Sequence, residues 1–445
     1  MQSSNTFTQG KILSPLLRFT VPVLFALILQ TMYGAVDLLV IGQFCSAADV
    51  SAVSTGSQIM HMVTVIITGL SMGTTVLLGQ KLGQGDLQGA GDAAGGSICL
   101  FAAGGALLTL ILVPFARPLS QLMQAPAEAL AATTDYVLIC GTGCLCIVAY
   151  NVLGSVFRGI GDSKTPLFAV TVACVTNIVL DLLFVAVFHW GVRGVALATV
   201  LAQLLSVVLS LMLIRKKGLS FPFSRSQIRF SKPVILRVVK LGAPVALQDF
   251  LVSCSFLVLI AIVNALGVIA SAGVGVAEKL CGFIMLFPSA FMQSMSAFVA
   301  QNIGAGRQDR AKRAMVYGMV TAFGVSLVLG YLGFFHGEML ASLFSRDPLV
   351  NAAAADYLRA YAIDTLLTSF MFCFVGYFNG CGQTTFVMLQ GFVGAFLVRI
   401  PVSFLMSRIT QRLFLIGMAT PCSTFVQILL CLWWFGRMNK RRLEA

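Results

Sequence analysis

Long apolar stretches recur along the whole chain and are separated by short polar segments. Each stretch carries few charges and is long enough for a helix to cross a hydrocarbon core about 30 Å thick. The pattern predicts twelve transmembrane helices, over residues 16–40, 52–78, 93–116, 130–157, 166–189, 194–214, 236–263, 274–302, 314–336, 352–378, 385–406 and 413–435. We therefore expect an all-α membrane protein.

Composition agrees with this pattern and excludes a soluble protein. Of the 445 residues, 58% are hydrophobic and only 10% are charged, whereas soluble domains carry about 25% charged residues. The twelve cysteines are scattered through the apolar stretches without the spacing of a metal site. We interpret them as small packing residues of the helices.

The net charge of +13 could indicate nucleic-acid binding, but its placement argues against that function. Lysine and arginine gather in alternate loops, and the densest run extends from Arg215 to Lys240, between the sixth and seventh predicted helices. Because the cytoplasmic loops of membrane proteins are enriched in these residues, the asymmetry predicts a multi-pass protein of the cell (inner) membrane. Both of its termini would lie in the cytoplasm.

The two halves of the chain resemble each other at an offset of 221 residues. The matched segments are 80–85 with 301–306, 158–161 with 379–382, and 135–136 with 356–357, while Pro22 matches Pro244 at an offset of 222. Six spans in each half give both halves the same orientation, which is a parallel repeat about an axis along the membrane normal. The predicted architecture is two pseudo-twofold-related six-helix lobes.

The repeat and the charged run together set the predicted domain boundaries. We expect an N-terminal lobe over 1–217, a cytoplasmic linker over 218–235, a C-terminal lobe over 236–436 and a basic cytoplasmic tail over 437–445. A cleft between two homologous lobes is a natural place for a substrate, and such lobes favour alternating access by rocking.

Four oxygen-bearing side chains lie within the predicted helices of the first lobe: Asp37, Asn177, Asp181 and Thr199. A charge near the bilayer centre costs at least about 2.5–3.5 kcal/mol, so each aspartate requires a reason. Asn177 and Asp181 are four residues apart and share a helix face. Two carboxylates held together would take up a proton or bind a hard cation. The alternative is a polar network that only holds helices together.

The second lobe carries weaker candidates. Glu278 lies at the start of the eighth predicted helix, beside Lys279, and Asp364 lies deeper, in the tenth. We interpret Glu278 and Asp364 as members of a substrate or polar network. Arg399, which lies close to Pro401, could pair with an acid of this lobe, and the sequence leaves that acid open.

Taken together, these features resemble a known family. A proline-bearing first helix with Asp37, the pair Asn177 and Asp181, the loop Arg-Gly-Ile-Gly-Asp-Ser-Lys-Thr-Pro over 158–166 and the duplicated lobes are similar to the multidrug and toxic-compound extrusion (MATE) transporters. The resemblance covers nearly the whole chain. It implies an exporter that exchanges inward-moving H+ or Na+ for outgoing organic cations and other amphipathic compounds.

The resemblance also implies which residues couple the ion. The cation site would consist of Asp37, Asn177, Asp181 and Thr199, which would be the metal ligands if the ion is Na+. Polar neighbours of that site would be Gln30, Tyr33 and Asn151. In another branch of the family the acids stand on the seventh helix and farther along the tenth. Here the matching stretches, 251–253 and the region of Thr368, carry no acid, so the chain is more similar to the branch with a first-lobe site.

Pro22 is the candidate hinge of the first helix. A proline removes one backbone hydrogen bond and kinks a helix where its neighbours permit. By resemblance, straight and bent forms of this helix would follow the protonation state of Asp37.

Other functions are less consistent with the sequence. The string Gly159-Ile-Gly-Asp162 matches a motif of intramembrane aspartyl proteases, but Asp162 falls in a predicted loop and no H-E-x-x-H metal motif occurs. A flippase for a lipid-linked sugar, built on a related fold, is the main alternative, yet it would line its cavity with arginines or lysines. A channel would require a repeated selectivity-filter loop, which the sequence does not contain.

We therefore expect a secondary active exporter that is not an enzyme and has no cofactor apart from the coupling ion. Its partners would be small organic cations or amphipathic compounds together with membrane lipid, and no nucleic acid. We expect the protein to act as a monomer.

Overall fold

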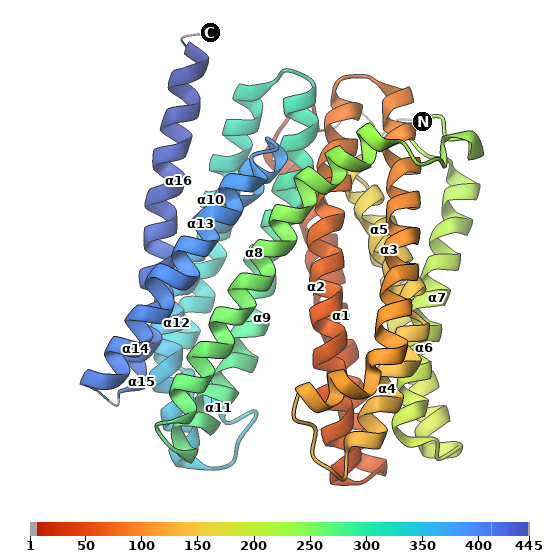
Figure 1. The fold of residues 1–445 in the computed structure, drawn as a ribbon. Coiled ribbons are helices and arrows are strands. Elements are labelled where there is room, and N and C mark those ends of the chain that lie inside the picture. The colour runs from red at the N-terminus through yellow and green to blue at the C-terminus, as the bar shows by residue number, and fades with distance from the viewer. Residues whose placement is uncertain (1–6, 411, 444–445) are drawn as a thin grey trace. The chain divides into compact units, whose positions relative to one another are not determined.

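The computed structural model describes residues 7–410 and 412–443, and the regular elements in these ranges are all helices. Among the described residues, eleven helices are long and apolar enough to span a membrane, and one bent pair of helices raises the number of spans to twelve. In each half of the chain, short turns join long helices (Figure 1). The prediction of an all-α protein with twelve spans is confirmed.

The first half of the chain begins with three long helices. Its elements are α1 (Leu13–Phe44), α2 (Ala47–Gly83), α3 (Leu87–Leu122), α4 (Leu130–Thr142), α5 (Cys144–Ile160), α6 (Lys164–Asp181), the π-helical segment η1 (Leu182–Val187), α7 (Gly191–Lys217) and the 3₁₀ turn η2 (Arg225–Gln227). The second half repeats this plan with α8 (Lys232–Asn264), α9 (Val268–Gly304), α10 (Gln308–Phe335), α11 (Gly337–Ala341), α12 (Pro348–Gly380), α13 (Thr384–Phe392), the π-helical segment η3 (Val393–Arg399), α14 (Ile400–Ile409), α15 (Leu413–Gly417) and α16 (Ala419–Leu443).

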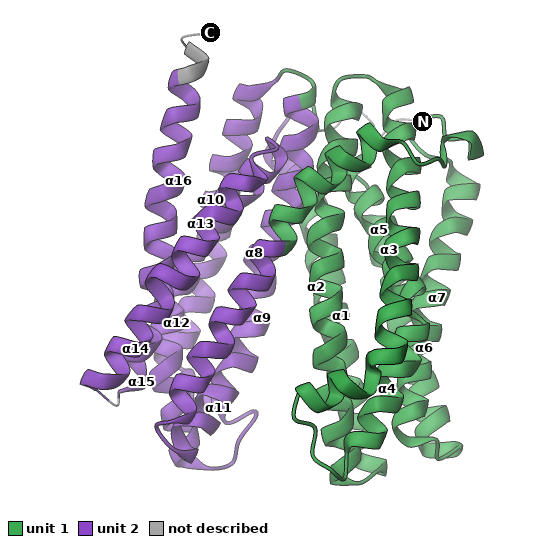
Figure 2. Ribbon diagram, viewed as in Figure 1, with its two compact units in different colours: residues 1–9, 18–246, 304–306 green, residues 10–17, 247–303, 307–445 purple. Residues whose placement is uncertain are grey.

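The chain divides into two compact units, which Figure 2 shows in different colours. Unit 1 holds residues 18–246, and unit 2 holds residues 10–17 and nearly all of 247–443. Each unit therefore consists mainly of one half of the duplicated sequence. The division falls inside α8, after residue 246, rather than in the segment 218–235.

The helices extend beyond the apolar stretches that predicted them. α8 begins at Lys232, so the last residues of the predicted linker 218–235 are helical. α16 continues to Leu443, so most of the predicted tail 437–445 belongs to the last helix, and 444–445 lie outside the described residues. Polar residues at a helix end extend the backbone hydrogen-bond ladder as readily as apolar ones, and hydropathy does not detect them.

Two predicted helices are broken into shorter pieces. The helix predicted over 130–157 bends by 53° between α4 and α5, at Gly143. A Cβ atom on Gly143 would lie 2.5 Å from the side chain of Val200 on α7, so only glycine allows this close approach. The helix predicted over 413–435 divides at Met418 into α15 and α16.

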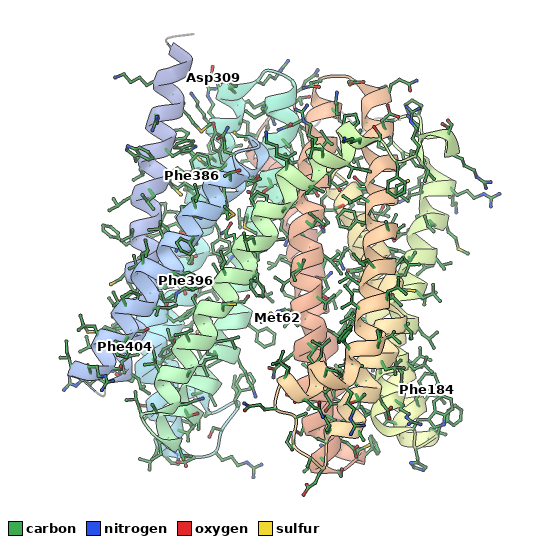
Figure 3. The ribbon with its side chains drawn as sticks, in the orientation of Figure 1. Met62, Phe184, Asp309, Phe386, Phe396 and Phe404 are labelled. Carbon is green, nitrogen blue, oxygen red and sulfur yellow. The ribbon has the colours of Figure 1, made fainter. Side chains whose placement is uncertain are left out.

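Two other spans contain a π-helical segment beside a buried charge. η1 begins directly after Asp181, and η3 ends at Arg399. Figure 3 labels Phe386, Phe396 and Phe404 along the span that contains η3. π-helical segments alter the side-chain register of a helix and are frequent at functional sites. The charged residues beside these two segments, Asp181 and Arg399, are therefore candidates for a functional role.

The backbone confirms the internal repeat at its turns. Gly85 and Gly306 have φ angles of 76° and 71°, and Gly161 and Gly382 have φ angles of 83° and 77°. The members of each pair are 221 residues apart and occupy the left-handed region, which glycine enters without steric cost. The two halves therefore end corresponding helices with the same turn.

A second repeated feature links the start of the fourth span of each half to the sixth. In unit 1, Arg193 Nε donates to Asp135 Oδ2 at 2.8 Å. In unit 2, the backbone N–H of Phe414 donates to Asp356 Oδ2 at 2.9 Å. The four residues correspond at the offset of 221, so duplication kept the linking carboxylate and changed its partner.

Small residues let helices of unit 1 approach closely. A Cβ atom on Gly73 of α2 would lie 2.2 Å from the carbonyl oxygen of Val238 on α8, and one on Gly242 of α8 would lie 2.1 Å from the carbonyl oxygen of Leu70. Backbone atoms cannot move aside as a flexible side chain can. This seam is the packing that membrane helices form through small residues, and it fixes α8 against α2 within unit 1.

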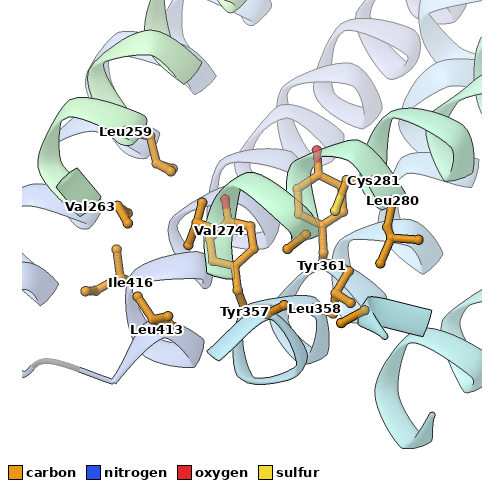
Figure 4. Close-up of a cluster of buried hydrophobic side chains, with 13 residues drawn as sticks. Leu259, Val263, Val274, Leu280, Cys281, Tyr357, Leu358, Tyr361, Leu413 and Ile416 are labelled. Carbon is orange, nitrogen blue, oxygen red and sulfur yellow. The ribbon is translucent and has the colours of Figure 1, made fainter. Parts of the chain in front are cut away.

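Unit 2 has an apolar core built from α8, α9, α12 and α15. The thirteen side chains of this cluster include Leu259, Val274, Cys281, Tyr357 and Tyr361. In Figure 4 the phenol oxygens of both tyrosines point in the same direction, away from the α12 backbone. The core therefore presents two polar atoms on one side, and these belong to the second site described below.

Candidate functional site

The candidate site in unit 1 forms where one face of α1 meets one face of α6. Along α1, Gln30, Tyr33 and Asp37 are three and four residues apart, so they share a face. Along α6, the buried positions 170, 174, 177 and 181 follow the same spacing. Tyr33 joins the two faces because its hydroxyl donates to the carbonyl oxygen of Val170 at 3.0 Å.

Four predicted residues come together at this junction. Asp37, Asn177 and Asp181 are each at most 3% exposed. The hydroxyl of Thr199, on α7, donates to Asp37 Oδ2 at 3.3 Å and to the carbonyl oxygen of Val195 at 3.1 Å. The side chains of Asp181 and Asn177 also interact with the Asp37 carboxyl. The structure therefore gathers three helices around two carboxyl groups.

Most polar atoms of this cluster lie close to one another but make no well-formed hydrogen bond within the described residues. Oδ1 of Asp37, both carboxyl oxygens of Asp181 and both polar atoms of the Asn177 amide are buried without a hydrogen bond. Among the described residues, the electrostatic neighbours of the two carboxyl groups include no lysine or arginine. Buried polar groups in proteins are normally hydrogen-bonded, and an exception requires an explanation. Four of these five atoms are oxygens, the ligand type of a hard cation, and the carboxyl oxygens among them can also take up a proton.

The remaining predicted neighbours form a separate layer. Gln30 donates to the hydroxyl of Tyr150 on α5. Asn151, the next residue of α5, accepts from Thr68 of α2 at 3.0 Å and donates to the carbonyl oxygen of Ile147 at 2.8 Å. Gln30 and Asn151 thus hold α1, α2 and α5 together, and their hydrogen bonds do not include the carboxyl pair.

Residues that the sequence analysis did not select also surround the carboxyl pair. Tyr136 of α4 interacts electrostatically with both Asp37 and Asp181, and Cys140 of α4 and Cys174 of α6 interact with Asp37. Tyr136 and Cys140 are four residues apart on one face of α4. The repeated dipeptide at 135–136 was a signal for Tyr136, whereas cysteines in apolar helices gave no signal.

Unit 2 holds a second polar centre, which includes Glu278 and Asp364. Asp364 of α12 is 1% exposed and accepts from the hydroxyl of Thr424, on α16, at 2.6 Å. Glu278 of α9 accepts from the hydroxyl of Tyr357, on α12, at 3.4 Å. Asp364 is therefore buried within unit 2, whereas Glu278 is half-buried and bonded to the buried Tyr357.

Arg399 belongs to the same centre. It is 5% exposed and interacts electrostatically with both Asp364 and Glu278. Its guanidinium donates to Ser255 Oγ of α8 at 2.9 Å and lies 4.1 Å from the centroid of the Phe256 ring. The sequence left open which acid Arg399 would accompany, and the structure places it near two.

Pro22 lies inside α1, which continues as a helix on both sides of it. Pro244 occupies the corresponding interior position of α8. The structure thus places the candidate hinge on the same helix as Asp37, fifteen residues before it.

Comparison with known sequences decides the family. The sequence model of the MatE family matches the chain twice, over residues 22–183 and 244–405. The chain belongs to the MatE family. The two matches begin 222 residues apart, as the internal repeat requires. This membership makes the protein a multi-pass transporter of the multidrug efflux class, not an enzyme, and it does not favour the flippase.

Curated members of the MatE family match over most of this chain. The probable multidrug resistance protein YpnP of Bacillus subtilis is 28% identical over 408 residues, which cover 90% of each chain. The multidrug export protein MepA of Staphylococcus saprophyticus is 23% identical, and the match covers 90% of this chain and 88% of MepA. A solved outward-facing MATE family transporter of the MOP superfamily has 19% identity and a TM-score of 0.93, covering 100% of this chain and 99% of that one. This last similarity shows the shared two-lobe fold.

Proposed function

We propose that this protein exports organic cations and other amphipathic compounds by antiport with H+ or Na+, which bind between Asp37 and Asp181. The observation that supports the proposal is the set of five buried polar atoms on Asp37, Asn177 and Asp181 that make no well-formed hydrogen bond within the described residues. The names of the relatives as multidrug proteins agree with the proposed substrate class. Alternating access of two homologous lobes would carry the substrate outward.

Charge balance provides the coupling. Two carboxylates without a counter-charge in a low-dielectric site bind a cation strongly. Once a proton or Na+ occupies the pair, the pocket loses negative charge and holds a cationic substrate less tightly, so the substrate leaves. Each charge that moves down 100 mV supplies about 2.3 kcal/mol, and about 1.4 kcal/mol corresponds to a tenfold ratio. One exchanged charge therefore sustains roughly a fortyfold to fiftyfold gradient.

The residues present fit either ion. The two carboxylates can share a proton, while the carboxylate, amide and hydroxyl oxygens of Asp37, Asp181, Asn177 and Thr199 form an oxygen-only ligand set suited to a hard cation. The distribution of lysine and arginine supports an inner-membrane location with both termini in the cytoplasm. We further propose that the monomer, surrounded by lipid, is the transporting unit.

The test is ethidium transport in proteoliposomes, with the sodium gradient and the proton gradient imposed separately. We expect one of the two gradients to drive ethidium against its concentration difference in the wild type. In Asp37→Asn this driven transport should disappear, because an amide keeps the volume and hydrogen bonding of the side chain but cannot carry negative charge.

Asp135→Asn is the matched control, because it removes an acid of the same unit that lies at the surface in an ion pair with Arg193. This control should couple as the wild type does. Ethidium transport by the wild type that responds to neither gradient, or full coupling in Asp37→Asn, would overturn the proposal.

A further inference from the structure

Arg399 is a buried positive charge that has few direct partners. Within the described ranges 7–410 and 412–443, its Nε atom makes no hydrogen bond, and its guanidinium donates to the neutral Ser255. The ion pairs within 4.0 Å among the described residues do not include Arg399. A guanidinium in the span of a membrane helix is costly and is normally paired or functional. Arg399 is therefore more than a packing residue of η3.

Two neutral groups fix the position of Arg399. Ser255 and Phe256 are consecutive residues of α8, and they contact the guanidinium by a hydrogen bond and by the aromatic face respectively. A cation over an aromatic ring gains about 0.5–2 kcal/mol without any charge partner. The guanidinium is thus held close enough to Asp364 and Glu278 to interact with them, but not in a closed ion pair with either.

The centre has an unbalanced charge. Asp364 and Glu278 are two carboxylates and Arg399 is one guanidinium, so one negative charge remains when all three are ionised. Hydroxyl groups of Thr424 and Tyr357 already donate to the two carboxylates. The guanidinium also has Tyr357 and Tyr361 as electrostatic neighbours and lies over the Phe256 ring. One singly charged organic cation would neutralise the remaining negative charge, and its apolar body would contact aromatic rings.

We propose that Arg399 is a built-in counter-ion that sets the charge of the exported substrate, so that unit 2 accepts compounds with one positive charge in preference to those with two. The inference rests on the proposed export function and adds a selectivity rule to it. Without Arg399 the two carboxylates would attract a doubly charged compound. With Arg399 in place, the second positive charge of such a compound meets a fixed guanidinium in a medium that screens it poorly.

The test compares ethidium with propidium, which share a phenanthridinium ring and carry one and two positive charges respectively. Initial rates at matched low concentrations in proteoliposomes give the ethidium-to-propidium ratio of transport efficiency. The wild type should prefer ethidium. Arg399→Gln should shift the ratio toward propidium by about tenfold or more, whereas Arg399→Lys, which keeps the charge, should stay within about threefold of the wild-type ratio.

A charge-restoring pair of variants makes the test independent of the folding of Arg399→Gln. Asp364→Asn alone leaves the centre neutral and should weaken ethidium binding about tenfold. Adding Arg399→Gln to Asp364→Asn restores one net negative charge, so ethidium binding should recover. Recovery is not expected if Arg399 is only structural, because a second disruption of the same centre would then add to the first.

The outcomes separate this inference from the proposed function. If the wild type moves neither dye against a gradient, the export function itself fails. If the wild type exports ethidium but Arg399→Gln reduces both dyes equally, or the double variant binds ethidium no better than Asp364→Asn, the selectivity role of Arg399 is overturned.

Discussion

The two polar centres lie in the two units of a duplicated chain and differ in their counter-charge. In unit 1, within the part of the chain that the structure describes, Asp37 and Asp181 have no lysine or arginine among their electrostatic neighbours, and three of their four carboxyl oxygens make no well-formed hydrogen bond. In unit 2, Asp364 and Glu278 share the electrostatic influence of Arg399. Two carboxylates without a nearby basic side chain can be neutralised only by a cation from solution. The two carboxylates of unit 2 are already partly neutralised by Arg399, so they require less positive charge from solution. This difference is the basis on which we propose unit 1 for the coupling ion and unit 2 for the substrate.

Duplication preserved the scaffold more closely than the chemistry. Tyr136 and Tyr357 correspond at the offset of 221, and each lies beside the acids of its own unit. Thr199 corresponds to Thr420, and both are on the sixth span of their half. The amide and the two acids of the unit 1 site have no polar counterparts, because Asn177 and Asp181 lie opposite Val398 and Val402, and Asp37 lies opposite Val258 or Leu259. Each unit therefore acquired its charges separately on a common frame.

The largest effect is expected from neutralising the second acid of unit 1. Asp181→Asn should abolish ion-driven export while expression stays nearly normal, because the pair can no longer gain and lose a cation. The measurement is dye efflux against an imposed ion gradient in proteoliposomes. Asp364→Asn, assayed in parallel, should still respond to the gradient. Coupled efflux that survives in Asp181→Asn and is lost only in Asp364→Asn would reverse the roles of the two units.

A smaller effect is expected on substrate affinity from unit 2. Glu278→Gln removes one carboxylate of the Arg399 centre and should raise the apparent KM for a singly charged dye about tenfold, with the maximal coupled rate retained. Concentration dependence of transport measures both quantities. Glu338→Gln, a substitution in the short α11 of the same unit, is the control and should have no effect. A loss of maximal rate without a change in KM would place Glu278 in the coupling step instead.

The two corresponding prolines should differ in their effect on turnover. Pro22 stands in the helix that carries Asp37, and Pro244 stands in α8. Pro22→Ala should restore a backbone hydrogen bond, stiffen α1 and slow turnover several-fold in a folded protein. Pro244→Ala should slow it less, because α8 carries neither acid of the coupling pair. Equal turnover in wild type, Pro22→Ala and Pro244→Ala would show that both prolines are only packing features.

The smallest effect concerns the repeated links at Asp135 and Asp356. The ion pair of Asp135 with Arg193 is exposed, with 36% and 70% of the two side chains accessible, so Arg193→Ala should cost less than about 1 kcal/mol. Asp356→Ala removes the acceptor of a partly buried backbone N–H and should cost about 1–2 kcal/mol. Thermal unfolding in detergent compares the two variants. A larger loss from Arg193→Ala would contradict this ranking.

The sequence predicts the spans well because hydrocarbon thickness imposes a simple requirement on each of them. It does not predict the break at Gly143, because that glycine is selected by contact with Val200 on a helix more than fifty residues later in the chain. It also misses the π-helical segments η1 and η3, whose surroundings have the same apolar composition as ordinary helix. The sequence could have predicted other helix ends, such as the start of α2, because Ser46 and Asp49 form a capping box with a recognisable spacing.

The candidate site could be predicted in part for a similar reason. Asp37, Asn177 and Asp181 stand out because charged and amide groups are rare in apolar helices. Asn151 does not join them, because it is four residues after Ile147 and hydrogen-bonds back to that carbonyl. The link between Arg399 and two acids depends on how α8, α9, α12 and η3 assemble, and no local pattern encodes that arrangement. Tertiary proximity, rather than residue type, was the missing information.

The burial of Arg399 also has a consequence for biosynthesis. The span that contains it, Thr384–Ile409, also carries Arg408. An arginine at mid-span costs about 2.5–3.5 kcal/mol when a nascent helix partitions from the translocon into lipid. Ser255, Phe256 and the two acids are synthesised before Arg399, so they are already present in the membrane to receive it. The order of the chain therefore lets the helices that receive Arg399 insert first, and they can then stabilise this charged span as it enters the membrane.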